Sequence, residues 1–214
     1  DIRKLHAFYN RQGDSIPYVV TNGFGVWAFD ADTPRFYQIP DLNSVHPRFG
    51  LASAVWRGEL YVATGMDILA FNGEVVRNVG LSRDDGIPYL YQGYVSSFAV
   101  GQNALYALVL GRTSGGLTYN SVHEWSGFGW HCIFAATNAI ASTRINISAA
   151  GGNLSLVWGL NNSGTMYSQT LPVEFTNPRE AIDNSGSSFG ITWITPANNT
   201  FYMESGRFDA NMKG

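Results

Sequence analysis

Short apolar stretches recur along this chain at a nearly constant spacing. Residues 18–21 (YVVT) are repeated as residues 61–64 (YVAT), and residues 28–30 (AFD) are repeated as residues 70–72 (AFN). The first two stretches start 43 residues apart, and the second two start 42 residues apart. Repeats of this length are typical of propellers and solenoids, in which each unit buries its apolar faces against its neighbours. This repeat constrains the fold more than any other feature of the sequence.

Further copies follow the first two. The tail of a third copy aligns with the second without a gap, because Gly127 and Trp130 each lie 54 residues after Gly73 and Val76. A tyrosine or leucine stands at the position of Tyr61 in three later copies, as Tyr106, Leu156 and Tyr202. The chain therefore contains about five units of roughly 40 to 50 residues.

Each unit is predicted to contain four short antiparallel strands joined by turns rich in Gly and Asn, which tolerate the positive φ of tight hairpins. In the second unit these strands are ASAVW, ELYVAT, DILAFN and VVRNVG. The prediction is an all-β fold, a β-propeller of about five blades of up to four antiparallel strands. We expect one propeller module over residues 1–214, excerpted from a longer chain. Its blades are predicted at about 1–48, 49–93, 94–143, 144–188 and 189–214, and the last blade is incomplete.

Composition excludes several classes of partner. Charged residues make up 14% of the chain, compared with about 25% in an average soluble domain, and the net charge is −3. No basic stripe is present, so the sequence predicts no nucleic-acid partner. No apolar run approaches the roughly 20 residues that span a bilayer, so it predicts no membrane insertion. The single cysteine, Cys132, excludes an intrachain disulfide and is predicted to be buried in a strand.

Two resemblances follow from the repeat. The stretch YVVTNGFGVWAFDADTPRFYQIP resembles the sensor-propeller repeat of two-component regulators over about one unit. The stretches YVATGMDILAFNGEVVRNVG, VHEWSGFGWHCIF and YMESGRFDANMKG resemble propeller modules of bacteriophage tail and virion-associated proteins over most of the chain. The second resemblance implies a propeller followed by a strand and a further β domain.

Candidate catalytic and metal-binding groups are weighed against simpler roles. Arg83, Asp84 and Asp85 share one loop, residues 82–88, but lack EF-hand spacing, so a solvated turn is favoured over a calcium site. The four histidines lack the i, i+4 or His-x-His spacing of a zinc or copper site. No Gly-x-Ser-x-Gly elbow is present. The sequence therefore predicts no catalytic residue, no cofactor, no metal site and no enzymatic activity.

Candidate binding residues are aromatic. Most of the six tryptophans occupy equivalent strand positions and are predicted to pack between blades. Trp125 and Trp130 are exceptions because they flank a Gly-rich turn, and an insertion at 111–121 lengthens one hairpin of the third unit. Since function concentrates on long loops, we expect the insertion and this turn to present four aromatic residues to a partner: Tyr119, Trp125, Phe128 and Trp130.

Two functions remain open at this point. The first is a non-enzymatic structural and binding module of a larger assembly, a phage tail or other virion component that contacts a receptor or neighbouring subunits. The alternative is a carbohydrate-binding lectin or the propeller domain of a glycan-active enzyme. The expected partners are other protein subunits of an assembly, or a host receptor or glycan, and a homo-oligomer is a further candidate. The expected location is the virion or the extracellular space.

Overall fold

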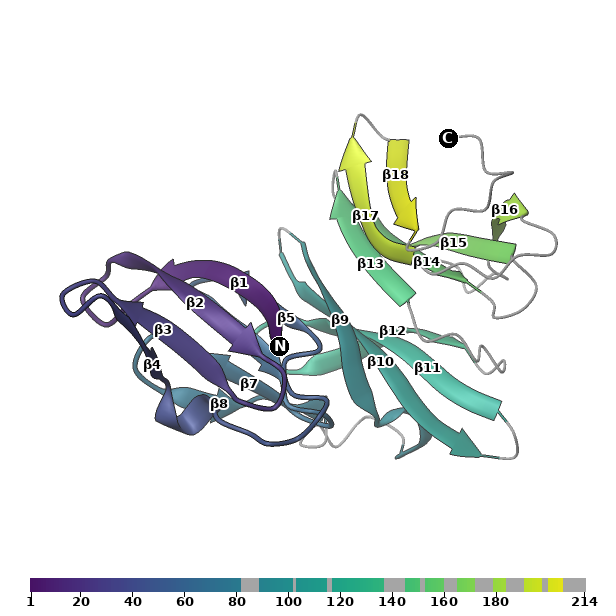
Figure 1. Cartoon of the computed structure of the whole chain (residues 1–214). Coiled ribbons are helices and arrows are strands. Elements are labelled where there is room, and N and C mark those ends of the chain that lie inside the picture. The colour runs from purple at the N-terminus through teal and green to yellow at the C-terminus, as the bar shows by residue number, and fades with distance from the viewer. Residues whose placement is uncertain are drawn as a thin grey trace.

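The secondary structure of the described residues consists of strands in antiparallel sheets and short 3₁₀ helices (Figure 1). The computed structural model describes residues 1–81, 89–101, 103–114 and 117–136, and then, by their backbone, 145–150, 153–159, 165–171, 179–183, 191–197 and 200–205. Within these ranges the strands form four sheets of four strands and one sheet of two. The predicted all-β fold with units of up to four antiparallel strands is thereby confirmed.

The first three sheets follow one another along the chain, each with its strands in sequential order. The first sheet contains β1 (Ile2–Tyr9), β2 (Ser15–Thr21), β3 (Val26–Asp30) and β4 (Arg35–Gln38). The second contains β5 (Ser53–Trp56), β6 (Glu59–Ala63), β7 (Ile68–Phe71) and β8 (Val76–Asn78). The third contains β9 (Tyr94–Val100), β10 (Leu105–Ser114), β11 (Leu117–Trp125) and β12 (Trp130–Ala136).

The remaining elements continue this pattern. The fourth sheet contains β13 (Ile145–Ala150), β14 (Asn153–Gly159), β15 (Thr165–Leu171) and β16 (Arg179–Asp183), and the fifth contains β17 (Ile191–Ala197) and β18 (Thr200–Ser205). The 3₁₀ helices η1 (Pro40–Leu42) and η3 (Tyr89–Tyr91) lie in connections between sheets. The strands of each sheet fall inside the predicted blade ranges, and the assignment of the whole chain to one module stays a prediction.

The first strand of each sheet lies beside the first strand of the next. Strand β1 contacts β5, β5 contacts β9, β9 contacts β13, and β13 contacts β17. Figure 1 shows the resulting arc of sheets, which begins at β1 and leads to β17 and β18. Sheets that share an axis through their first strands are the arrangement of a propeller. The fold is therefore propeller-like.

Alternation along the strands explains why neighbouring sheets pack on one another. Successive side chains of a strand point to opposite faces. In β6, Leu60 and Val62 belong to the core shared with the first sheet, whereas Tyr61 and Ala63 belong to the core shared with the third. All four side chains are buried. A strand covered on both faces reads as a continuous apolar run, which is how β6 appears in the sequence.

Each of these two cores contains a group of aromatic side chains at corresponding positions of the repeat. In the first, Phe8 and Tyr18 of the first sheet meet Phe71 of the second, with ring centroids 6.2 and 6.3 Å from that of Phe71. In the second, Trp56 packs on Tyr61 at 6.1 Å, and the Trp125 Nε1–H donates to the Tyr61 hydroxyl at 3.3 Å. Phe71 and Trp125 lie 54 residues apart. The repeat read from the sequence is thus a repeat of the packing between sheets.

Polar side chains join the first strands of sheets one and two. His6 Nε2 lies 2.8 Å from Ser53 Oγ, and Lys4 Nζ donates to the Ser53 carbonyl oxygen at 3.0 Å. Ser53 itself is buried between two alanines, Ala52 and Ala54. Burial, and then the nearby charge of Lys4, lower the pKa of His6 from 6.5 to about 4. His6 is therefore neutral in the folded protein at neutral pH.

This depressed pKa predicts an acid-sensitive contribution to stability. Below pH 6.5 the unfolded chain protonates His6 while the folded chain does not, so the free energy of unfolding falls as the pH drops from about 6.5 to about 4. In chemical denaturation across this range, His6→Gln should lose less stability than the native chain. Equal slopes of the unfolding free energy against pH in the two proteins would contradict this role of His6.

None of the helices among the described residues has the length and apolar character needed to span a membrane.

Candidate binding site

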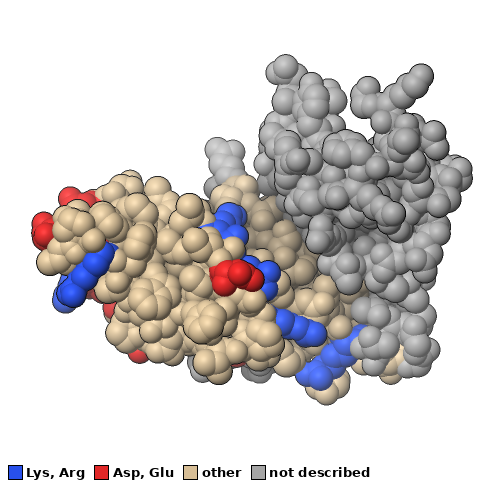
Figure 2. Space-filling model, viewed as in Figure 1, with Lys and Arg blue, Asp and Glu red and all other residues tan. Residues whose placement is uncertain are grey.

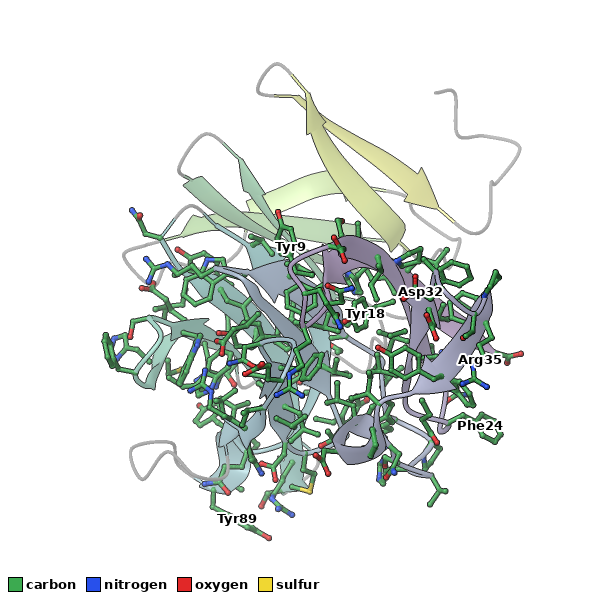
Figure 3. All side chains as sticks on the ribbon, turned by 90° about the vertical axis from the view of Figure 1, so that its left-hand side faces the viewer. Tyr9, Tyr18, Phe24, Asp32, Arg35 and Tyr89 are labelled. Atoms are coloured by element: carbon green, nitrogen blue, oxygen red, sulfur yellow. The ribbon has the colours of Figure 1, made fainter. Side chains whose placement is uncertain are left out.

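The sheets have two different ends, and the position of every candidate residue depends on which end it occupies. We use the name connection end for the end of the sheets at which β5 and β9 begin. The hairpins β2–β3, β6–β7 and β10–β11 also turn at this end. We call turn end the opposite one, where the first and third hairpins of each sheet turn. In Figure 3, Tyr9 at the end of β1 marks the turn end, and Tyr89 before β9 lies at the connection end, on the other side of the molecule.

The four predicted binding residues divide between these ends. Tyr119 lies near the start of β11, at the connection end, whereas Trp125 is the last residue of the same strand. Six residues of extended strand span about 20 Å. Phe128 lies in the turn between β11 and β12, and Trp130 begins β12. The expectation that the insertion and the Gly-rich turn face one partner together is therefore wrong, because β11 connects them across the sheet.

The two tryptophans are also not presented at the surface. Both are 6% exposed and lie in the core between sheets two and three. Their ring centroids are 5.2 Å apart, and the Trp130 Nε1–H donates to the Val79 carbonyl oxygen at 2.6 Å. Trp125 is fixed by Tyr61 across the same interface. The predicted exposure of Trp125 and Trp130 is wrong because the second sheet covers them. Phe71 is covered in the same way by the first sheet.

Phe128 lies at the surface as expected, whereas the insertion is not the loop that the sequence predicted. Phe128 is 97% exposed, as expected of a turn residue. The described residues of the insertion, 111–114 and 117–121, are strand rather than loop, because β10 and β11 continue to pair until Ser114 faces Leu117. A register shift interrupts the pairing of this extended hairpin between Leu110 and Thr113, as at a β-bulge. A binding role for any of the four residues stays a prediction.

A different group of side chains gathers at the connection end of the third sheet. The Arg112 guanidinium lies 4.0 Å from the Tyr89 ring centroid, and the Arg48 guanidinium lies 3.8 Å from that of Tyr94. The rings of Tyr91 and Tyr119 meet edge to face at 5.6 Å. We call this group the tyrosine–arginine patch; its members are Arg48, Tyr89, Tyr91, Tyr94, Arg112 and Tyr119.

Two glycines allow the backbone segments of the patch to approach each other closely. A Cβ at Gly93 would overlap the Leu110 carbonyl and come within 2.6 Å of Gly111 Cα. A Cβ at Gly111 would overlap the Tyr119 carbonyl and come within 2.6 Å of the Leu90 carbonyl oxygen. The segment 89–94 can therefore lie directly on the β10–β11 hairpin only because both positions lack a side chain.

The patch combines accessible aromatic surface with guanidinium donors. Tyr89 is 63% exposed, and Arg48 is exposed as well. Arg112 is half-buried, and its Nε atom is buried without a hydrogen-bond partner. Burial, followed by Cys132 and Tyr119, raises the pKa of Tyr91. Its hydroxyl thus stays protonated near neutral pH and is available to donate or accept a hydrogen bond.

The sequence analysis found only Tyr119 among these six residues. The missed signal is the stretch PYLYQGY at residues 88–94, which places three tyrosines between the last strand of one unit and the first strand of the next. No local sequence pattern marks Arg48 or Arg112 as a member of the patch. Only the fold brings Arg48, for example, beside Tyr94.

Other sequence candidates have simpler outcomes. Arg83, Asp84 and Asp85 lie outside the described residues. Cys132 is on β12, as expected of a strand residue, but it is partly exposed rather than buried. Across the described ranges, no group of three or more His, Cys, Asp or Glu side chains that could hold a metal ion was found.

One comparison with known proteins, to a solved structure, bears on the fold. No family model matches this chain, and no curated protein matches it in sequence. Among solved structures, AofleA from Arthrobotrys oligospora is similar, with a TM-score of 0.52 and 16% sequence identity. The alignment covers 87% of this chain, which spans 59% of the length of AofleA. YCF48 bound to D1 peptide aligns with a TM-score of 0.42 and 14% identity over 96% of this chain and 75% of YCF48. Neither is described as a phage protein or a two-component regulator. Both of those resemblances therefore stay predictions, while the likeness to AofleA agrees with a propeller-like fold.

Proposed function

We propose that this chain is a non-enzymatic binding module, a five-bladed β-propeller that recognises a carbohydrate through the tyrosine–arginine patch. The observation that carries the proposal is the paired stacking of Arg48 on Tyr94 and of Arg112 on Tyr89 at one end of the third sheet. This choice favours the second of the two functions left open by the sequence. Five consecutive sheets linked through their first strands support the blade count.

The chemistry of the patch suits a sugar. Aromatic rings offer apolar surface to the C–H faces of a pyranose, while tyrosine hydroxyls and guanidinium N–H groups supply hydrogen bonds to its oxygens. Arginine also matches a carboxylate with two parallel donors. The exposed guanidinium of Arg48 supplies such donors in the patch. We therefore propose a glycan that carries a carboxylate as the ligand class.

The setting predicted from the sequence, a virion or the extracellular space, is compatible with such a role and stays a prediction. The same holds for contact with neighbouring protein subunits in an assembly. The proposal contains no catalytic step, so release of a smaller sugar by the purified chain would contradict it.

A glycan array followed by calorimetry tests the proposal. The chain should bind glycans with acidic residues, and Tyr89→Ala and Arg112→Ala should each weaken binding by about 1–2 kcal/mol, roughly tenfold. Arg112→Lys should weaken it similarly, since lysine keeps the charge but loses the planar donors. Phe128→Ala is the matched control, because Phe128 is an exposed aromatic residue at the turn end. Binding of no glycan, or equal loss in the control, would refute the proposal.

A further inference from the structure

A histidine in the connection between the first two sheets continues the tyrosine–arginine patch. His46 comes two residues before Arg48, and the backbone N–H of Arg48 donates to His46 Nδ1 at 3.1 Å. A ring nitrogen that accepts a hydrogen bond carries no proton, so the proton of the neutral imidazole lies on Nε2. Because His46 is exposed, its Nε2–H is a donor that a ligand on Arg48 can reach.

The imidazole ring is positioned by the β6–β7 hairpin of the second sheet. It lies directly on Gly65, where an added Cβ would come within 2.8 Å of His46 Cε1. Met66 follows Gly65 in this hairpin and is 45% exposed, and Val45, which precedes His46, is 92% exposed. The ring therefore has accessible apolar side chains as its neighbours.

Three kinds of group thus follow one another at the connection end. The Arg48 guanidinium, stacked on Tyr94 with 3.8 Å to the ring centroid, supplies positive charge. His46 supplies one N–H donor, and Met66 and Val45 supply apolar surface. Figure 2 shows basic side chains at the lower right of the described surface, over the region of η3 in Figure 1, next to uncharged surface. A ligand that matches this order has a carboxylate, then a hydrogen-bond acceptor, then a small apolar group.

We propose that the glycan bound by the tyrosine–arginine patch is an acidic sugar with an N-acetyl group, and that His46 and Met66 select this group. The inference rests on the proposed function and names the ligand of the same site. The acetamido carbonyl oxygen accepts from His46 Nε2–H, and its methyl group covers apolar surface of Met66 and Val45. The carboxylate of the same sugar pairs with Arg48. A uronic acid has the carboxylate alone and so uses only part of the site.

Calorimetry with a matched pair of sugars tests the inference. The first is a trisaccharide that ends in N-acetylneuraminic acid, and the second is the same trisaccharide with a hydroxyl in place of the acetamido group. The native chain should bind the first about tenfold more tightly, because the second lacks both the hydrogen bond and the methyl contact. Equal affinity for the two would overturn this inference and leave the proposed function intact. Binding of neither, nor of any other acidic glycan, would refute both.

Variants show which residues set the preference. In His46→Asn the side-chain oxygen can still accept from the Arg48 N–H, but no donor remains where Nε2 lies, so the ratio of the two affinities should fall towards one. Met66→Ala should lower this ratio as well, and Met66→Leu should restore it. Phe24→Ala is the matched control, because Phe24 is the counterpart of Met66 in the first unit and is 66% exposed. With all variants shown to be folded by thermal melts, a ratio unchanged in both His46→Asn and Met66→Ala, or lowered equally in the control, would contradict the assignment.

Discussion

Replacing Tyr61 by alanine is expected to lower the free energy of unfolding by about 3–5 kcal/mol, as for other large aromatic side chains removed from a core. Tyr61 is 1% exposed and packs between Trp56 of its own sheet and Trp125 of the third. Its removal leaves a cavity between two sheets whose backbones are fixed by their own ladders. Neither sheet can close that space without disturbing the contact between β5 and β9.

The tyrosine hydroxyl adds a polar contribution that a second variant isolates. It donates to Glu59 Oε2 at 2.8 Å and accepts from Trp125 Nε1. Burial, and then the hydrogen bond to Glu59, raise the pKa of Tyr61 to about 12, so the hydroxyl keeps its proton. Tyr61→Phe fills the cavity but loses both hydrogen bonds and should cost about 1–3 kcal/mol.

Chemical denaturation of the three proteins checks these values. The order of stability should be native, then Tyr61→Phe, then Tyr61→Ala. An alanine variant with an unchanged midpoint would show that Tyr61 does not hold sheets two and three together.

The sequence predicted the sheets correctly because the repeat reflects their packing. Gly73 and Gly127, aligned without a gap, both adopt positive φ, at 101° and 105°. The residues that flank them also correspond, since Phe71 pairs with Val76 and Trp125 with Trp130. Position-by-position equivalence of this kind depends on local registers and turns, which are encoded in neighbouring residues.

The binding site was predicted less well because it depends on contacts between distant segments. Trp125 and Trp130 flank a glycine-rich turn, and a sequence does not reveal that the neighbouring sheet lies over them. Tyr119 and Trp125 are close in sequence, but the strand that contains both carries them to opposite ends. Arg48 reaches Tyr94 from another sheet connection, so no spacing rule links the two.

Replacing Gly93 by alanine is expected to destabilise the protein by about 3 kcal/mol, near the upper end of the usual cost of overpacking. The added Cβ would overlap the Leu110 carbonyl and crowd Gly111 Cα, and both neighbours are backbone. Relief therefore requires β9 and β10 to separate where Tyr94 pairs with Leu110.

Gly13→Ala is the matched control for this substitution. A Cβ at Gly13 has no atom within 4 Å, so alanine there meets only the strain of its φ of +89°, about 1–2 kcal/mol. Denaturant titrations should place Gly93→Ala below Gly13→Ala in stability. Tyr94, which stacks with Arg48, is the residue that follows Gly93. Glycan binding should therefore also fall in the Gly93 variant at temperatures where it remains folded. It should persist in the Gly13 variant. Equal stability of the two variants would mean that segment 89–94 does not lie directly on the β10–β11 hairpin. It would thereby contradict the close backbone contact that supports the tyrosine–arginine patch.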